Sequence, residues 1–332
     1  MTCLGLLLWA AMLLALVAGE YKIVPFDVFA FLWAKVNNLS TENFSRVQEV
    51  IIWNLRTPRM FLALSAGMAL AVSGVAYQAC FRNPLVEPYI LGVSSGAACG
   101  AALAIIFPVI FPQSQVSAFI FALAAVSLTY FLAHRRGETP TVTLVLSGII
   151  VGALFSASVG IMKYLSDDTQ LREITFWMMG GLYYATWDAA MLNLCFVIPC
   201  LLVLWAMGWK LNLLSLGDEE SRSLGLNPSV MRLLAVLVGT LAAAVTVSLT
   251  GIIAWVGLMM PHAARMLFGP DHRWVVPGAA LMGGIYLLIC DTIARTLTGT
   301  EIPIGIITSI VGAPYLLWLL RAKGGSMYGS HS

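Results

Sequence analysis

Charged residues are scarce in this sequence, which limits the kinds of protein it can encode. They make up 10% of the 332 positions, against about 25% in a typical soluble domain. Hydrophobic residues make up 60%, and the mean hydropathy is +0.89. These values indicate an integral membrane protein with most of its mass in lipid. The formal net charge of +2 is too small to imply a nucleic acid partner.

Motifs of catalysis and nucleotide binding are also missing. No lysine is preceded by glycine, so there is no Walker A loop and the chain does not bind ATP by that route. The six cysteines show no CxxC or Cys/His metal spacing, so we interpret them as small packing residues. The histidines are scattered, and His262, which follows Pro261, is interpreted as structural at a helix break. We therefore expect this chain to bind no cofactor and to be no enzyme.

Apolar segments of spanning or near-spanning length recur along the whole chain. They predict an all-α membrane protein with about ten transmembrane helices in one domain, residues 1–332. The eighth segment is short, which indicates a tilted or partial crossing. The first lacks the basic residues of a signal peptide, which favours a retained span. The segments are 3–19, 59–79, 89–110, 116–133, 141–162, 189–209, 230–250, 252–268, 274–295 and 304–321.

Basic residues in the short loops set the predicted orientation, because cytosolic loops carry an excess of them. The long segment 20–55 counts less than the short loops. Both termini are then cytosolic, in a multi-pass protein of the cell (inner) membrane. The basic residues placed inside are Arg82, Arg135, Arg136, Lys210, Arg222, Arg232, Arg265, Arg273, Arg321 and Lys323. Those placed outside are Lys22, Lys35, Arg46, Arg56, Arg59, Lys163, Arg172 and Arg295.

The most charged insert between two apolar segments is 213–227, which holds three acidic residues at 218–220 and then Arg222. Gly217 and Gly225 break it, so we predict two short helices joined by a turn. The insert is either a solvated loop or a docking platform for a soluble partner. On the outer side, the aromatic stretch 176–187 predicts a short interfacial helix, and another is expected within 20–55.

Three arginines stand at the predicted outer ends of spans: Arg56, Arg59 and Arg295. Guanidinium groups pair with carboxylates at two points, so these arginines form a candidate anion-binding surface. Anchoring to lipid headgroups is the alternative. Asp291 lies four positions before Arg295, which fits either a structural ion pair or part of that surface. Small residues such as Gly67 and Gly74 in the second span predict close helix packing, with a pore-lining face as the alternative.

Several motifs together resemble the permeases of the type II ABC importers for iron–siderophore, haem and cobalamin. They run in the family's order over nearly the whole chain. WMMGG and LGVSSGA are especially similar to the cobalamin permease. The matching stretches are LRTPRM (55–60), ALAVSGVAYQACFRNPLVEPYILGVSSGAA (69–98), WMMGG (177–181), SLGDEESRSLGLN (215–227), GIIAWVGLMMPHAARMLFGPDHR (251–273), DTIAR (291–295) and EIPIGIITSIVGAPYLLWLL (301–320).

The resemblance implies a homodimer of ten-span subunits with a translocation path at the two-fold axis. Two ATP-binding cassette subunits, which carry ATP and Mg, dock from the cytosol, and a soluble substrate-binding protein docks from outside. The expected function is import of a bulky metal chelate: a ferric siderophore, haem or cobalamin.

The resemblance also assigns roles to residues. It implies binding-protein docking by Arg56, Arg59 and Arg295, a cytosolic gate at Thr141 and Val142, and an outer gate around Arg172 and 176–187. Val142 is apolar where the cobalamin permease has a small hydroxyl residue, which leaves the substrate open. Coupling to the ATPase is implied for Leu216, Gly217, Asp218, Glu219, Ser221, Arg222, Leu224 and Gly225.

Other functions remain open at this point. The same family includes importers of molybdate and other oxyanions. An ion-driven secondary transporter would need an acidic residue near the middle of a span, and the sequence shows none. A membrane-embedded enzyme would need convergent polar groups inside the apolar segments, and these are almost absent.

Overall fold

The computed structural model describes residues 1–19, 21, 23–41, 44–134 and 139–327, and every regular element in these ranges is helical. Lys22, Arg135 and Arg136, which contribute to the predicted orientation, lie outside the described residues. The elements are α1 (Thr2–Val17), α2 (Pro25–Val36), α3 (Arg46–Glu49), the π-helical η1 (Val50–Arg56), α4 (Thr57–Phe81), the 3₁₀ turn η2 (Pro88–Leu91), α5 (Val93–Ile106), α6 (Ser114–Ala133), α7 (Thr141–Leu165), α8 (Asp168–Met179), α9 (Trp187–Ala206), α10 (Gly208–Leu216), α11 (Asp218–Ser223), α12 (Pro228–Thr250), α13 (Val256–Phe268), α14 (His272–Ala294) and α15 (Ile304–Met327).

Six helices in the described part of the chain are long and apolar enough to cross a membrane. Three further apolar helices are shorter: α1, α5 and residues Ile304–Trp318 of α15. The predicted eighth segment corresponds to α13, which has only 13 residues, as its short apolar run suggests. The six long helices are Arg46–Phe81, Ser114–Ala133, Thr141–Leu165, Trp187–Ala206, Pro228–Thr250 and His272–Ala294.

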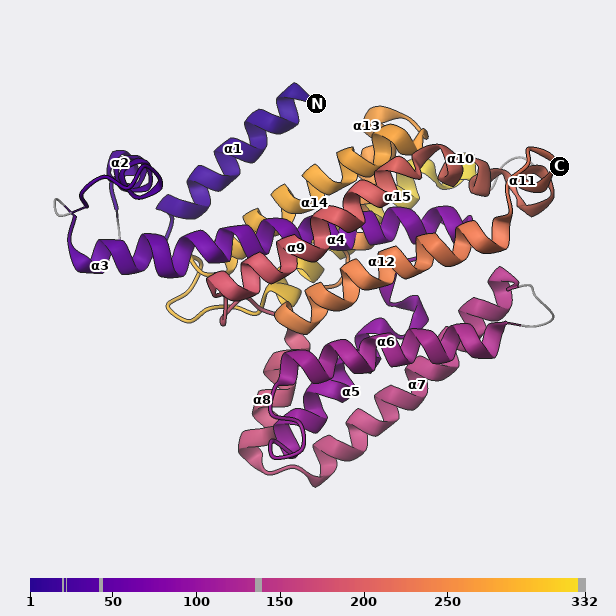
Figure 1. The fold of residues 1–332 in the computed structure, drawn as a ribbon, viewed down its shortest axis with the longest axis horizontal. Helices are drawn as coiled ribbons and strands as arrows, with labels where there is room; N and C mark the ends of the chain where they lie inside the picture. The colour runs from indigo at the N-terminus through magenta and orange to yellow at the C-terminus, as the bar shows by residue number, and fades with distance from the viewer. Residues whose placement is uncertain (20, 22, 42–43, 135–138, 328–332) are drawn as a thin grey trace.

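Helix α4 runs through the centre of the largest group of helices, with α9, α12, α13 and α14 packed around it (Figure 1). Nearly all its side chains are buried. Gly67 lies directly against the backbone of Gly283, and Gly74 against that of Gly257, so a methyl group at either glycine would collide with a carbonyl oxygen. Small residues let helix backbones approach closely where lipid offers no hydrophobic drive. The packing interpretation of Gly67 and Gly74 is therefore confirmed.

Helices α5 to α8 form a second group, which joins the first where α5 and α6 pack against α12 (Figure 1). The figure also shows two distinct ends of the bundle. Helices α2 and α3 lie at one end, and α11 lies at the other, near the start of α7. We call these the outer end and the coupling end, after the orientation predicted from the loops.

The second span begins earlier than the sequence predicts. The predicted segment starts at residue 59, whereas the helix is continuous from Arg46 to Phe81 through the π-helical turn. Ser45 starts it with a capping box, in which Ser45 Oγ accepts from the Gln48 amide at 3.2 Å. Arg56 and Arg59 therefore lie within one continuous helix.

Two local predictions are wrong. The helix expected over 176–187 instead covers Asp168–Met179, because Asp167 caps its first turn and Gly180, with φ +69°, ends it. The expected break at Pro261 is absent, since α13 continues through Pro261 and His262. Pro261 lies in the first half of this short helix, where it removes only one backbone donor.

Candidate functional site

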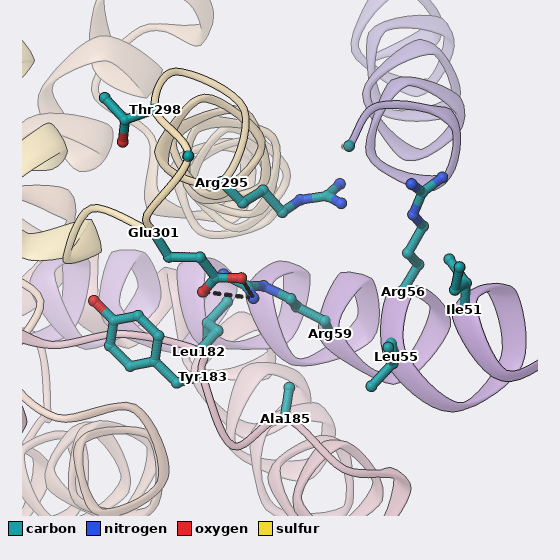
Figure 2. Close-up of a pocket in the computed structure, with 12 residues that line it drawn as sticks. Ile51, Leu55, Arg56, Arg59, Leu182, Tyr183, Ala185, Arg295, Thr298 and Glu301 are labelled. Carbon is teal, nitrogen blue, oxygen red and sulfur yellow. Dashed lines mark hydrogen bonds and ion pairs between the residues drawn. The ribbon is translucent and has the colours of Figure 1, made fainter. Parts of the chain in front are cut away.

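The three arginines singled out in the sequence surround one cavity at the outer end. The cavity has a volume of about 320 Å³, and its lining includes Arg56, Arg59, Arg295, Glu301 and Tyr183 (Figure 2). The arginines come from η1, α4 and the end of α14, and Glu301 from the loop that follows α14. The structure thus brings together all three residues of the predicted docking set.

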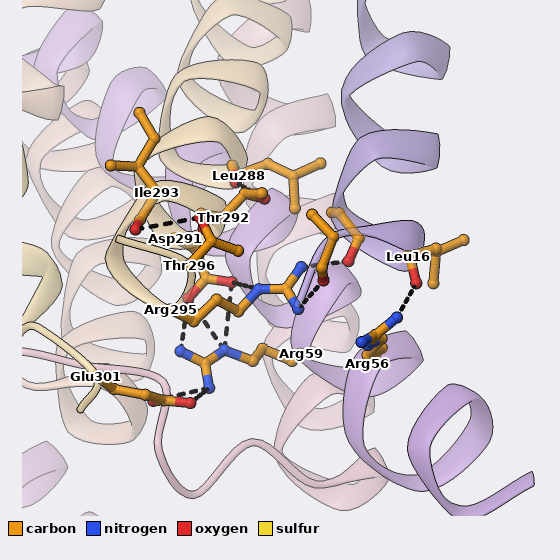
Figure 3. A network of polar contacts seen from close by, with 12 residues as sticks. Leu16, Arg56, Arg59, Leu288, Asp291, Thr292, Ile293, Arg295, Thr296 and Glu301 are labelled. Carbon is orange, nitrogen blue, oxygen red and sulfur yellow. Dashed lines mark hydrogen bonds and ion pairs between the residues drawn. The ribbon is translucent and has the colours of Figure 1, made fainter. Parts of the chain in front are cut away.

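Arg59 is held by two carboxylates (Figure 3). Its Nε and Nη2 atoms donate to Asp291 Oδ1 at 3.0 and 2.9 Å, and its Nη1 donates to Glu301 Oε1 at 2.7 Å. Asp291 also forms an i,i+4 ion pair with Arg295, one of the two alternatives that the sequence left open, with Arg295 Nε 3.7 Å from Asp291 Oδ2. Asp291 is only 1% exposed, so its charge is neutralised entirely by protein groups.

Arg56 and Arg295 donate hydrogen bonds to the C-terminal end of α1. Arg56 donates from Nη1 to the carbonyl oxygens of Leu16 and Val17, at 2.8 and 3.0 Å. Arg295 donates from Nη1 to the carbonyl of Ala18 at 2.9 Å, and from Nη2 to that of Ala15. The last carbonyls of a helix lack intrahelical donors and carry partial negative charge, so guanidinium groups satisfy them well.

These contacts show what the sequence did not reveal. The pattern of the sequence indicates carboxylate partners for the arginines, but two of the three bind mainly backbone oxygens. Every residue type carries a backbone carbonyl, so nothing in the sequence indicated that the end of α1 would accept hydrogen bonds from these arginines. Counting three arginines against Asp291 and Glu301, the cluster keeps one net positive charge, at the wall of a cavity.

A second and larger cavity of about 780 Å³ also opens near the outer end. Its wall combines aromatic rings of Phe176, Trp177, Tyr183 and Tyr184 with polar groups that include Arg172. Arg172 and the aromatic stretch 176–187 are the residues expected at the outer gate. The structure therefore gathers them around one space that is wide enough for a ligand larger than a simple ion.

The segment 213–227 folds into two short helices, as predicted. Helix α10 ends at Gly217, whose φ of +140° turns the chain into α11. Gly225, with φ +80°, lies two residues after the end of α11 and stops that helix from continuing. Ser221 is fully buried and donates to the carbonyl of Leu213 at 2.7 Å, which ties α11 to α10. Leu216 and Leu224 point outward instead, 58% and 59% exposed.

The two predicted gate residues lie at the same end as α11. Thr141 is the first residue of α7, and Val142 follows with its side chain 69% exposed. Pro140 precedes them in extended conformation, as a proline before a helix favours.

The possible metal ligands among the described residues are scattered. No group of three His, Cys, Asp or Glu side chains there converges to hold a metal ion. All six cysteines are free, and four of them are buried, which confirms the packing interpretation for Cys80, Cys99, Cys200 and Cys290.

Comparison with known proteins adds to this geometry. Residues 7–322 match the model of the FecCD transport family. The hemin transport system permease protein HmuU of Yersinia pestis is 42% identical over 277 residues, covering 81% of this chain and 83% of that protein. The molybdate import system permease protein MolB of Haemophilus influenzae is 36% identical, covering 98% of this chain and 96% of that protein.

Two further matches extend this similarity. The vitamin B12 import system permease protein BtuC of Escherichia coli is 36% identical and covers 97% of this chain and 94% of that protein. Among solved structures, an inward-facing conformation of a transporter assigned to the metal-chelate ABC type superposes with a TM-score of 0.85 at 34% identity. That match covers 97% of this chain and 98% of the other.

Proposed function

The chain belongs to the FecCD transport family, and on that premise we propose that it is the permease subunit of an ATP-driven importer for a bulky metal chelate. Two copies form the complete pore, with the translocation path between them. Two ATP-binding cassette subunits bind at the coupling end and hydrolyse ATP with Mg, while a soluble binding protein delivers substrate at the outer end. The chain itself has a transport role without catalysis.

The observation that carries this proposal is the structure of the two short helices α10 and α11, which we call the coupling segment. It presents exposed Leu216 and Leu224, while Ser221 ties α11 to α10 and α10 packs against α4 and α14. An exposed apolar side chain on a rigid, acidic platform is suited to docking in a groove of another protein. Because α10 follows α9 directly and α11 leads into α12, a push on this segment reaches two spans at once.

At the outer end, we propose that Arg56, Arg59 and Arg295 receive acidic side chains of the binding protein. The net positive charge of the cluster supports this, since charge complementarity steers association. Arg59 Nη1 is the best placed donor, because its present partner, Glu301, is 38% exposed and can be displaced. Arg56 and Arg295 add positive charge to the same surface while they also hold the end of α1.

The aromatic cavity supports a bulky substrate over a small oxyanion. A volume of about 780 Å³ with four aromatic rings in its wall exceeds what a single molybdate ion needs. Molybdate import is nevertheless the second candidate, because a molybdate permease aligns with 98% of this chain. Haem, ferric siderophores and cobalamin are the bulky alternatives.

Reconstitution with the neighbouring gene products tests the proposal. The chain is expressed with its associated ATPase subunit and binding protein, purified as a complex and placed in liposomes. We expect ATP-dependent accumulation of one of haem, cobalamin or a ferric siderophore. Accumulation of molybdate alone would support the second candidate, and failure to recover any ATPase subunit with the chain would contradict both.

A further inference from the structure

Arg232 connects the coupling segment to the start of α7. It is the fifth residue of α12, and its side chain is 2% exposed. Its Nη2 atom donates to Asp218 Oδ1 on α11 at 2.6 Å, and its Nη1 donates to the carbonyl of Thr139 at 3.0 Å. One planar guanidinium therefore joins three parts of the chain: α11, α12 and the residues just before α7.

The side chain of Thr139 is buried and hydrogen-bonded. It is 2% exposed, and its Oγ1 lies 3.0 Å from His134 Nδ1 and 3.3 Å from Tyr130 Oη at the end of α6. Only Pro140 separates Thr139 from Thr141, the first residue of α7. The ring of proline fixes φ and the peptide bonds are planar, so a displacement of Thr139 passes to Thr141 with little loss.

The charges make this link hard to break. A buried guanidinium is costly unless a carboxylate neutralises it, and Asp218 supplies that carboxylate. Asp218 is itself 36% exposed on α11, at the surface where a partner would press. When α11 moves, separation from Asp218 would leave Arg232 charged and buried. The Arg232 guanidinium therefore moves with Asp218, and the Thr139 carbonyl moves with the guanidinium.

We propose that Arg232 is a positioning residue that transmits displacement of α11 to the gate end of α7, where Thr141 and Val142 lie. The proposal rests on the proposed function, since it assumes that an ATPase subunit moves α11. It assigns to Asp218 a specific task within the coupling segment: Asp218 engages the link, whereas Leu216 and Leu224 face the partner. It predicts that ATP hydrolysis and gate movement separate when the link is cut.

Two variants cut the link in different ways. Arg232→Lys keeps the positive charge, but a single ammonium lacks the two-pronged geometry that reaches Asp218 and Thr139 together. Asp218→Asn keeps the shape and the surface position but removes the ionic attraction to Arg232. Lys35→Arg is the matched control, because Lys35 also pairs with a carboxylate, Glu49, at 2.7 Å, but lies on α2 at the end of the bundle opposite α11.

The three variants and the wild-type chain are assembled with the ATPase subunit and binding protein in liposomes. Haem, cobalamin and molybdate are each supplied, and the compound that the wild-type complex accumulates serves as the probe. We expect Arg232→Lys and Asp218→Asn to lower uptake per ATP hydrolysed at least tenfold, with hydrolysis within twofold of wild type. Lys35→Arg keeps the wild-type ratio.

Hydrogen exchange supplies a second readout that a purely structural role would not change. We expect ATP binding to alter exchange in the first turn of α7 in the wild-type complex, and this response to be lost in both link variants. An unchanged ratio of uptake to hydrolysis, or equal loss of both activities, would overturn the role of Arg232. A wild-type chain that neither binds an ATPase subunit nor transports would overturn the proposed function as well.

Discussion

Arg59 on α4 and Asp291 on α14 lie 232 positions apart in the chain and form a two-point ion pair at the outer end of the bundle. Asp291 is 1% exposed and also faces Arg295 at 3.7 Å. One buried carboxylate thus separates two guanidinium groups. Asp291 joins α4 to α14, whose Arg295 binds the end of α1. The carboxylate therefore stabilises the packing of these helices and also lies within the cluster that contains the predicted docking arginines.

Removal of the Asp291 charge should destabilise the protein strongly. Asp291→Asn leaves Arg59 and Arg295 close together without their shared counter-ion, and breaking a buried pair in this way costs about 3 kcal/mol. Thermal unfolding in detergent measures the change. Glu301→Gln is the control, since the Arg59–Glu301 pair is more exposed and its loss should cost less than about 1 kcal/mol. Equal effects of the two variants would contradict the central role of Asp291.

Close contact between α4 and α13 predicts a second large effect. Gly74→Ala drives a methyl group into the carbonyl of Gly257, a backbone atom that cannot rotate away. Overpacking of this kind costs about 3 kcal/mol. Gly160→Ala on α7 meets nothing within 4 Å and serves as the control. We expect a lowered unfolding temperature and loss of folded protein for Gly74→Ala alone; similar unfolding temperatures would show that α4 and α13 separate easily.

Charge placed on the exposed leucines should prevent docking of the ATPase subunit. Leu216→Asp with Leu224→Asp replaces two apolar side chains that are more than half exposed. We expect at least a tenfold loss in association with the ATPase subunit, measured by co-purification and titration, and an unchanged unfolding temperature. Leu297→Asp, at an equally exposed leucine after α14, is the control. Undiminished association would argue against the coupling role of this segment.

Asp271 predicts a pH dependence at the coupling end. Its carboxylate accepts from Arg273 Nη2 at 2.6 Å and from Asn212 Nδ2 at 2.8 Å, and these bonds hold its pKa below the ordinary value of 3.8. A pKa lowered by folding contributes stability above pH 3.8, and that contribution disappears as the pH falls through the folded value.

Asp271→Asn isolates this charge, because asparagine also caps a helix. We expect the variant to unfold at a slightly lower temperature than wild type at pH 7, and the difference to vanish toward the acid limit. The effect is small, since Asp271 pairs with an arginine that is 57% exposed at the surface. A difference that grows on acidification would contradict the assigned direction of the pKa shift.

Local features of this protein follow from local sequence. Gly217 and Gly225 alone predict that 213–227 folds as two short helices, because each supplies a backbone conformation that other residues avoid. The long apolar runs predict most of the spans for an equally local reason. The family was also recognisable, because its motifs are contiguous stretches. The errors, at α8 and at Pro261, fell where capping by Asp167 or the tolerance of a short helix outweighed composition.

The partners of the charged groups were decided by the tertiary structure. The sequence placed Arg56, Arg59 and Arg295 at one end of the bundle, but it did not show that two of them bind the last carbonyls of α1. It likewise counted Arg232 among the basic residues on the cytosolic side, with no sign that Asp218 and the Thr139 carbonyl both accept from its guanidinium. Periodicity reports which side of a helix is apolar. A guanidinium finds its acceptors only when packing brings distant backbone within 3 Å of it, and that distance is a property of the assembled bundle.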